Sequence, residues 1–295
     1  MAPFRSGVAA VVGRPNVGKS TLVNALVGAK VAIVSDRPQT TRRDIRAIRT
    51  TPDAQVVFTD TPGFHKPRTL LGSRLNDAVG AAVEGVDVVL LVVDAAAGVG
   101  RGDRYVADRQ LAAAGPAARI CVVNKVDRLR RPHVIPQLQA AADLAEFDEI
   151  VPVSATTGEG VQTVARLVVE RLPEGPPLFP EEDVTDQPLD IRLAELVREQ
   201  ALRLTREEVP HSVAVVVEEI EREGDLTRVH ATVVVERDSQ KGIVIGRRGD
   251  TLKQIGTMAR AQIESLLGTR VYLDLRVKVL REWQRDPKAL NRLGF

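Results

Sequence analysis

The chain has 295 residues, of which 44% are hydrophobic and 27% are charged, and its formal net charge is +2. This composition is enough to build real hydrophobic cores in about two domains, while the small net charge identifies no partner. The single cysteine, Cys121, excludes an internal disulfide, and no apolar run is long enough for a bilayer span or a signal peptide. We therefore expect a cytoplasmic protein.

The first part of the chain alternates between predicted strands and predicted helices. Apolar runs predict strands at residues 7–12, 55–59, 86–93, 119–123 and 149–153. Helical patterns lie between several of these runs, at residues 19–27, 71–84 and 134–144. Because continuous apolar runs suit strands that are buried on both faces, the alternation predicts an α/β fold with a mainly parallel sheet and helices on both of its faces.

The alternation stops at a proline-rich segment. Residues 173–180 contain four prolines, and residues 173–188 carry five acidic and no basic side chains. Neither a helix nor a central strand is compatible with this composition, so we interpret the segment as an interdomain linker. The predicted domains are residues 1–172 and residues 189–295, joined by residues 173–188.

The last part of the chain predicts a smaller α+β domain. A helical pattern is followed by two alternating strands with a turn at Gly224 between them. A basic glycine-rich loop then precedes a long helix, for which Gly268 fits as the C-cap, and a final strand. The helices are predicted at residues 189–204 and 251–267, the strands at 212–221, 227–236 and 271–279, and the loop at 246–249.

Residues 13–20 match the pattern GxxxxGK[ST] in full, between a predicted strand and a predicted helix. Glycines in such a loop let backbone N–H groups turn toward phosphate oxygens, and the helix N-terminus adds positive potential. Lys19 should reach the β- and γ-phosphates, and Ser20 should hold Mg²⁺. A chance glycine-rich turn is the alternative, and the flanking elements argue against it. The predicted phosphate-binding residues are Gly13, Arg14, Pro15, Asn16, Val17, Gly18, Lys19, Ser20 and Thr21, with Asp60 and Gly63.

Two further segments are expected beside the phosphates. Asp60 ends a predicted strand, where a carboxylate suits a water-mediated contact with Mg²⁺. The polar residues 35–43 predict a loop, in which Thr41 is our choice for a second Mg²⁺ ligand and Thr40 is the alternative. The predicted switch residues in these segments are Gln39, Thr40, Thr41, Arg42, Thr61, Pro62 and Phe64.

The sequence Asn124-Lys125-Val126-Asp127 follows another predicted strand and suits recognition of guanine. The carboxylate of Asp127 can accept both N–H groups on one edge of guanine, whereas adenine would leave it unsatisfied. Asn124 can tie this loop to the phosphate loop, and the stem of Lys125 can lie along the base. Ser154 and Ala155, at the next strand end, can present a backbone N–H to the guanine O6.

Together these motifs resemble, in their order, those of the translation-factor class of GTPases. The sequences Arg14-Pro15-Asn16 and Thr40-Thr41-Arg42 are similar to those of the Era, Der and MnmE branch. The resemblance implies binding and hydrolysis of GTP with Mg²⁺. Phe64 stands where Ras-like enzymes carry a water-orienting glutamine, which implies slow intrinsic hydrolysis or another way of positioning water. The resemblance also makes Asn16 a candidate ligand for a potassium ion that replaces an arginine finger.

The loop at residues 246–249 resembles the GxxG loop of a type II KH domain, which clamps the backbone of single-stranded nucleic acid. Its two glycines allow close approach, and its two arginines supply charge. Tyrosine and tryptophan are absent from the sequence around the loop, so base stacking has little support. A basic turn capping a helix is the alternative, and the order of the surrounding elements argues against it. The predicted RNA-binding residues are Lys241, Ile245, Gly246, Arg247, Arg248, Gly249 and Lys253.

A GTPase domain, a short linker and one KH-type domain together resemble the Era family over nearly the whole chain. Der would have two GTPase domains, and MnmE would carry a C-terminal cysteine motif. The resemblance implies binding of single-stranded RNA near the 3′ end of 16S ribosomal RNA, a role in assembly of the small ribosomal subunit, and loose association with the inner face of the cell membrane.

We expect the protein to be a monomer. The alternative function is a signalling GTPase whose C-terminal domain binds a protein partner. An enzyme that acts on RNA is disfavoured, because no second catalytic constellation lies within residues 189–295.

Overall fold

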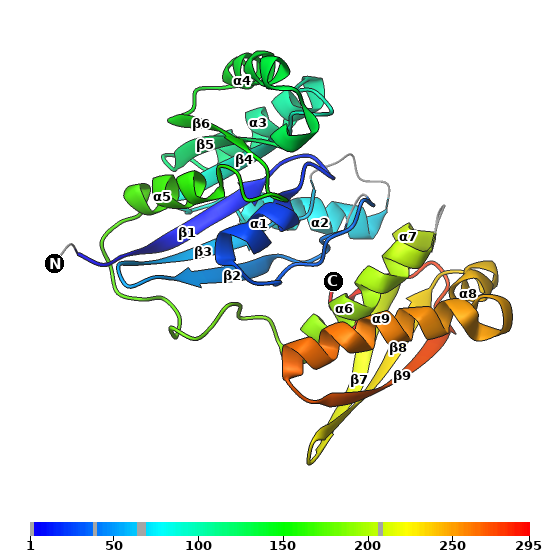
Figure 1. Cartoon of the computed structure of the whole chain (residues 1–295). Coiled ribbons are helices and arrows are strands. Elements are labelled where there is room, and N and C mark those ends of the chain that lie inside the picture. The colour runs from blue at the N-terminus through cyan, green and yellow to red at the C-terminus, as the bar shows by residue number, and fades with distance from the viewer. Residues whose placement is uncertain (1–2, 38–39, 64–68, 206–208) are drawn as a thin grey trace. The chain divides into compact units, whose positions relative to one another are not determined.

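The computed structural model describes residues 3–37, 40–63, 69–205 and 209–295 (Figure 1). The chain forms two compact units, each described here by itself. The first comprises Met1–Val34, Thr41–Pro67 and Gly72–Asp186, and the second comprises Ser35–Thr40, Arg68–Leu71 and Gln187–Phe295. Among the described residues, no helix has the length and apolar character needed to cross a membrane.

The first unit is built on a six-stranded sheet, as its alternating pattern predicts. The strand order is β2-β3-β1-β4-β5-β6, in which β2 is antiparallel to β3 and the other pairs are parallel. The strands are β1 (Arg5–Val12), β2 (Ile45–Thr50), β3 (Ala54–Asp60), β4 (Val88–Asp94), β5 (Ala118–Asn124) and β6 (Glu149–Val153). The helices are α1 (Lys19–Val27), α2 (Leu70–Ala81), α3 (Arg101–Ala113), α4 (Val134–Ala142) and α5 (Val161–Arg171), with short 3₁₀ turns η1 (Val126–Arg128) and η2 (Arg131–His133).

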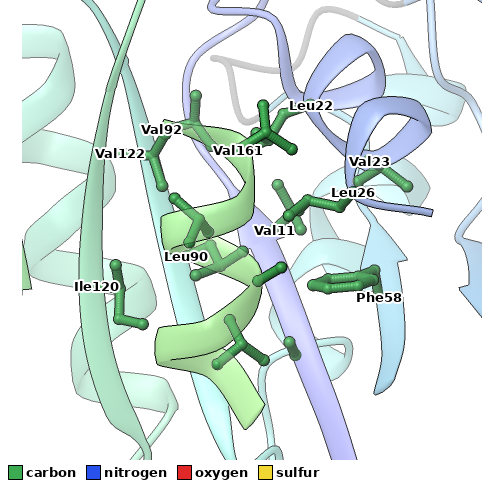
Figure 2. Packing of buried hydrophobic residues seen from close by; sticks show 14 of the residues in the cluster. Val11, Leu22, Val23, Leu26, Phe58, Leu90, Val92, Ile120, Val122 and Val161 are labelled. Carbon is green, nitrogen blue, oxygen red and sulfur yellow. The ribbon is translucent and has the colours of Figure 1, made fainter. Parts of the chain in front are cut away.

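Side chains that alternate along the central strands enter two hydrophobic clusters on opposite faces of the sheet. Leu90 and Val92 pack with α1 and α5, whereas Leu91 and Val93 pack with α3 and α4. Figure 2 shows the first of these clusters, in which Leu22 and Leu26 of α1 lie against the sheet. The prediction of helices on both faces is confirmed.

Strand β2 is an element that the sequence pattern did not predict. It lies at the edge of the sheet and pairs on one side with β3. Ile45, Ala47 and Ile48 are buried, while Arg46 is exposed and Arg49 is half-buried. An edge strand with one exposed face has no continuous apolar run in its sequence. The polar residues before β2 also give no signal of where the strand begins.

The proline-rich segment runs along the first unit. The N–H of Ser6 donates to the carbonyl of Pro173 at 3.1 Å, and the side chain of Gln55 donates to the carbonyl of Phe179 at 2.9 Å. The N–H of Ile48 donates to the carbonyl of Val184 at 2.9 Å. Backbone groups that prolines leave without a ladder partner are thus satisfied by the sheet, and residues 173–186 belong to the first unit.

The second unit has a three-stranded sheet of order β7-β8-β9, with β7 antiparallel and β9 parallel to β8. The strands are β7 (Ala214–Glu223), β8 (Leu226–Val235) and β9 (Arg270–Val279). Helices α6 and α9 pack with one face of this sheet around a single hydrophobic cluster. The helices are α6 (Leu189–Leu204), α7 (Val209–Ser212), α8 (Asp238–Ile245), α9 (Asp250–Leu267) and α10 (Pro287–Arg292), with η3 (Arg247–Gly249) between α8 and α9.

The order of elements expected for a KH-type domain is confirmed, and the second helical region divides into α8 and α9 at the glycine-rich loop. The chain after β9 closes the unit. Trp283 is fully buried, donates from Nε1 to the carbonyl of Ser212 at 3.1 Å, and stacks on Phe295 with 5.7 Å between ring centroids. A fully buried indole of this size anchors the C-terminal segment to the rest of the unit.

Candidate functional site

The phosphate loop connects β1 to α1 and depends on backbone conformations that favour glycine. Gly13 and Gly18 have φ of 154° and 99°, and a side chain at Gly18 would collide with the amide of Asn124. Asn16 also adopts a left-handed conformation, with φ of 65°. Gly18 caps α1 without a side-chain hydrogen bond, so no side chain competes for the N–H groups of the first turn. The loop can therefore close around an anion.

Lys19 lies across this loop. Its Nζ donates to the carbonyls of Gly13 at 3.2 Å and Arg14 at 3.0 Å. Burial lowers the pKa of Lys19 to about 8, and the nearby carboxylate of Asp60 opposes that shift. A buried ammonium group whose own partners are two loop carbonyls is placed to attract a phosphate.

Three oxygen-bearing side chains meet beside Lys19. The hydroxyl of Ser20 donates to Oδ2 of Asp60 at 2.7 Å, and the hydroxyl of Thr41 donates to the same atom at 3.1 Å. The two hydroxyl oxygens are 2.9 Å apart. Thr40, the alternative to Thr41, instead donates from its hydroxyl to the carbonyl of Arg37 at 2.7 Å. Thr41 is therefore the threonine that belongs to this cluster.

One oxygen of the Asp60 carboxylate has no hydrogen-bond donor among the described residues. It is fully buried, and its Oδ1 accepts no hydrogen bond from the residues that the structure describes. Burial raises the pKa of Asp60, while the ammonium of Lys19 and the hydroxyls of Ser20 and Thr41 oppose that shift. A buried carboxylate oxygen without a donor, next to two hydroxyls, matches the oxygen ligands that Mg²⁺ prefers.

The residues after Asp60 pack closely on the phosphate loop. Thr61 donates from its hydroxyl to the carbonyl of Val11 at 2.9 Å, and Pro62 is buried. A side chain at Gly63 would lie 2.8 Å from Cα of Pro15, so only glycine fits at that distance. Of the other predicted switch residues, Arg42 is buried, and Gln39 and Phe64 lie outside the described residues.

Asn124 connects the predicted base-binding loop to its neighbours. Its Nδ2 donates to the carbonyl of Val17 at 2.9 Å, and its Oδ1 accepts from the N–H of Ala155 at 3.0 Å. The N–H of Ser154 donates to the carbonyl of Glu159 at 2.9 Å. The backbone N–H groups of Ser154 and Ala155, which we expected to face guanine, therefore already donate hydrogen bonds within the loops. A contact with the base would have to be an additional hydrogen bond from one of these N–H groups.

Two acidic residues that sequence reasoning missed organise the same region. Asp94 accepts from Nζ of Lys125 at 2.6 Å, and Lys125 also donates to the carbonyl of Asn16 at 2.6 Å. Buried Asp103 accepts from Nε of Arg14 at 2.7 Å. No local pattern marks these partners, because each pair joins residues far apart in the chain.

The two ion pairs fix the side chains of Arg14 and Lys125, whereas Asp127 has no part in them. The side chain of Arg14 is held by Asp103, so its contribution to an anion site is its backbone. Asp127, in η1, is exposed. Its carboxylate is therefore open to solvent at the end of β5, while Lys125 beside it is fixed.

The glycine-rich loop of the second unit forms a tight turn with exposed arginines. Gly246, Arg248 and Gly249 have φ of 75°, 55° and 85°, and a side chain at Gly246 would collide with Thr251. Arg247 and Arg248 both face solvent. Two guanidinium groups on a turn that admits close approach fit contact with a phosphate backbone.

A groove of about 440 Å³ opens beside this turn, between α9 and β9. Leu273 and Leu275 of β9 give it apolar surface, and Lys253 and Arg260 of α9 add charge. The full lining is Gly249, Leu252, Lys253, Gly256, Thr257, Arg260, Tyr272, Leu273 and Leu275.

The lining differs from the sequence expectation in two ways. Lys253 and Gly249 border the groove, whereas Lys241 and Ile245 lie on α8 and are not among its lining residues. The sequence around the loop contains no tyrosine or tryptophan, and β9 nevertheless places Tyr272 among the residues that border the groove. The register of a strand that begins 21 residues after Gly249 decides this, and the local sequence around the loop contains no trace of it.

Known families match both halves of the chain. A model described as 50S ribosome-binding GTPase matches residues 8–125, and a KH domain model matches residues 208–284. GTPase Era of Mycobacterium bovis and GTPase Era of Mycobacterium tuberculosis are each 54% identical to the chain over 301 residues, covering 100% of both proteins. The chain belongs to the Era family of GTPases. It is therefore a GTP-hydrolysing enzyme with a C-terminal KH domain.

Solved Era structures agree with this architecture from end to end. A crystal structure of Era in complex with MgGDPNP and nucleotides 1506–1542 of 16S ribosomal RNA matches with a TM-score of 0.95 at 38% identity, covering 99% of each chain. A variant of Aquifex aeolicus Era bound to GDP·AlF4⁻ matches with a TM-score of 0.94 at 38% identity, again over 99% of each chain. The Era fold thus accounts for both units of this chain.

Proposed function

We propose that this Era-family GTPase is a Mg²⁺-dependent switch that binds single-stranded RNA from the 3′ region of 16S ribosomal RNA and acts in assembly of the small ribosomal subunit. One observation carries the RNA part: a turn with two exposed arginines opens onto a groove with apolar and basic lining. The solved relative that holds a 16S fragment and MgGDPNP supports the choice of RNA and nucleotide.

In this proposal GTP occupies the loops at the carboxyl ends of β1, β3, β5 and β6. Residues 13–21 bind its phosphates with the help of Lys19 and Gly63, and Asp127 accepts from the guanine edge. Asn124, Ser154 and Ala155 hold the base loops together, which is supported by the hydrogen bond between Ala155 and Asn124.

Mg²⁺ would be held by the hydroxyls of Ser20 and Thr41, with Asp60 supplying the carboxylate. When bound, the ion supplies charge neutralisation for the β- and γ-phosphates. Asp60 keeps both hydroxyls turned toward one point, and Lys19 adds a second positive charge. Catalysis by these residues is positioning and charge stabilisation, without a covalent intermediate.

The proposal includes potassium near Asn16, on the strength of the family resemblance alone. A hydrolysis rate that is equal in potassium and sodium salts would remove this element. The protein is proposed to act as a cytoplasmic monomer. Peripheral association with the inner face of the membrane is carried by the family resemblance alone.

We place the GTPase domain at residues 1–172 and the KH-type domain at residues 189–295, with residues 173–188 between them. GTP would order residues 35–43 and 61–72, and hydrolysis would release them. Within the second unit, buried Arg198 donates from Nη2 to the carbonyl of Thr40, the residue before Thr41. This bond supports coupling of nucleotide state to RNA binding. Equal RNA affinity with a GTP analogue and with GDP would contradict it.

The test is filter binding of a single-stranded 16S 3′ RNA to the full-length protein. Arg247→Ala with Arg248→Ala should weaken binding strongly because two phosphate contacts are lost. Gly256→Leu should weaken it without changing charge, since even a Cβ at Gly256 would lie 3.5 Å from Leu275 and a larger side chain would fill the groove. Arg109→Ala with Arg166→Ala removes the same charge from exposed sites of the first unit and serves as the control.

The outcomes separate the two functions considered for the chain. Loss of binding in the turn variant and in Gly256→Leu, with the control unaffected and circular dichroism unchanged, supports RNA recognition by the KH domain. A wild-type protein that fails to bind RNA would favour a signalling GTPase whose C-terminal domain binds a protein.

A further inference from the structure

The loop after β4 contains none of the residues predicted to bind GTP, although β4 lies between β1 and β5 in the sheet (Figure 1). The phosphate loop follows β1 and the base loop follows β5, so the carboxyl end of β4 lies between these two loops. Asp94 is the last residue of β4, is buried, and pairs with Asn124 in the register of β5. A carboxylate at this place can act on both loops.

Each oxygen of the Asp94 carboxylate has its own partners. Oδ1 accepts hydrogen bonds from the N–H groups of Ala96 at 2.9 Å and Ala97 at 3.1 Å, which closes the turn after β4. Oδ2 accepts from Nζ of Lys125 at 2.6 Å, and the side chains of Asp94 and Lys125 are 12% and 20% exposed. Because solvent and salt screen such a pair less than a surface pair, the carboxylate can fix the position of the ammonium group.

Lys125 continues the connection to the phosphate loop. Its Nζ also donates to the carbonyl of Asn16 at 2.6 Å, and its Cε would lie 3.8 Å from a Cβ placed on Gly18. The lysine stem therefore runs beside the phosphate loop, and its ammonium group joins that loop to β4. A lysine side chain is long and flexible, so two fixed acceptors restrict it more than one acceptor would.

The backbone at both ends of this connection adopts a conformation that is unfavourable for residues with a Cβ atom. Asn16 and Lys125 have φ of 65° and 66°, in the left-handed region. Residues persist in this region where their surroundings hold them there. The bonds that Lys125 makes to Asn16 and Asp94 come from the protein itself, so the lysine stem is preorganised for a ligand.

We propose that Asp94 is a positioning residue for guanine nucleotides, which acts by holding Lys125 between β4 and the phosphate loop. The inference rests on the proposed GTP site and adds a residue to which that site assigns no contact with the nucleotide. With Asp94 in place, the stem of Lys125 offers an apolar surface to the plane of guanine. Without it, the ammonium group keeps one acceptor, and ordering of the stem on binding lowers the affinity.

The experiment measures the affinity of the full-length protein for GDP that carries a fluorescent N-methylanthraniloyl group on its ribose. Asp94→Asn keeps an Oδ1 acceptor for the N–H groups of Ala96 and Ala97 but removes the charge that holds Lys125. The affinity should fall about tenfold or more, the usual effect of losing one charge-assisted hydrogen bond. Asp94→Ala also removes the acceptor of the turn, so its melting temperature should be lower than that of Asp94→Asn.

The same strand provides a matched control. Asp87 immediately precedes β4 and accepts from the N–H of Val8 at 2.8 Å, at the opposite end of the strand from Asp94. Asp87→Asn makes the same chemical change at a carboxylate that is bonded to backbone but lies away from the nucleotide loops. Its affinity for the labelled GDP should stay within about twofold of the wild type.

A double-mutant cycle separates positioning from a merely structural role. Lys125→Met keeps an unbranched apolar stem and removes the ammonium group through which Asp94 acts. Adding Asp94→Asn to Lys125→Met should therefore change the affinity by less than about twofold. Losses of about tenfold in both backgrounds would show that Asp94 acts independently of Lys125, and would overturn the inference.

The results also distinguish this inference from the proposed GTP site. If Asp94→Asn binds the labelled GDP like the wild type while Asp127→Asn loses its preference for guanine, the positioning role is overturned and the base site stands. If Asp127→Asn keeps that preference, the base site and this inference fall together.

Two further measurements apply if Asp94→Asn fails to fold, as judged by circular dichroism. Asp94→Ser takes its place in the cycle, since a hydroxyl can also accept from the N–H groups of the turn. Acetylation of Lys125 in the nucleotide-free wild type needs no variant at Asp94. Labelling much slower than that of exposed Lys288 supports a lysine that is held before the nucleotide binds, and equal labelling overturns the inference.

Discussion

The hydroxyl of Ser20 donates a hydrogen bond to Oδ2 of Asp60 over 2.7 Å, across 40 positions of sequence. The bond joins the first turn of α1 to the end of β3. It directs a hydroxyl and a buried carboxylate at one point, and Oδ1 of Asp60 has no donor of its own among the described residues. This pair is the core of the Mg²⁺ site that we propose.

Replacing the carboxylate should raise the requirement for Mg²⁺. In Asp60→Asn we expect the Mg²⁺ concentration for half-maximal GTP hydrolysis to rise about 10- to 100-fold, the usual effect of losing a supporting group at a metal site. Asp53→Asn, the same change in an exposed residue before β3, should leave the Mg²⁺ titration unchanged. An Asp60→Asn enzyme with a normal Mg²⁺ titration would contradict this assignment.

Asn124→Ala should destabilise the first unit and weaken nucleotide binding together. The substitution leaves the carbonyl of Val17 and the N–H of Ala155 without their partner, and each buried unsatisfied group costs about 1–3 kcal/mol. We expect a loss of about 2–4 kcal/mol in the free energy of unfolding, measured by urea denaturation followed by circular dichroism. Gln162→Ala, which removes an exposed amide bonded to Arg49, should change it by less than about 0.5 kcal/mol. Equal stabilities for the two variants would refute the bridging role.

Asp127 should determine the choice of base. Asp127→Asn replaces an acceptor with a group that also donates, so guanine loses two charge-assisted hydrogen bonds and GTP affinity should fall about 100-fold or more. Xanthine carries a carbonyl where guanine carries its amine, so XTP affinity should rise. Competition binding with GTP, XTP and ATP measures this, with Asp143→Asn as the exposed control. Unchanged preference for GTP in Asp127→Asn would remove the base site from this loop.

Lys19 should couple nucleotide binding to proton uptake. Its pKa is about 8 without ligand, because burial disfavours the charged form. Phosphates stabilise the ammonium group and raise that pKa, so binding of GDP takes up a proton only when the pH is high enough for free Lys19 to be deprotonated.

The affinity for GDP should therefore be nearly constant below pH 7.5 and should fall as the pH rises through 8, by up to about tenfold per unit. Calorimetry at pH 8.5 in two buffers of different ionisation enthalpy measures the uptake. Guanosine, which lacks phosphates, should show none. Absence of buffer dependence with GDP would mean that Lys19 is charged before the nucleotide arrives.

The GTP-binding motifs could be predicted from the sequence because each is a short loop directly after a strand. Parallel strands bring their carboxyl ends to one edge of the sheet, so Lys19, Asp60 and Asn124 are brought together once their strands are recognised. The choice between Thr40 and Thr41 could not be made in this way. Neighbouring threonines have the same local chemistry, and only the path of the chain to Asp60 separates them.

Contacts between distant segments were decided by the tertiary structure alone. The pairing of Asp94 with Lys125, the pairing of Asp103 with Arg14 and the place of Tyr272 at the border of the groove each depend on the register of strands or on the packing of a helix. Local spacing is a property of consecutive residues, so the sequence by itself determined the fold class and the nucleotide motifs of this protein. The tertiary structure alone decided which distant side chain completes each site. The reason is that whole helices and strands pack through many weak interactions, and no single motif contains them.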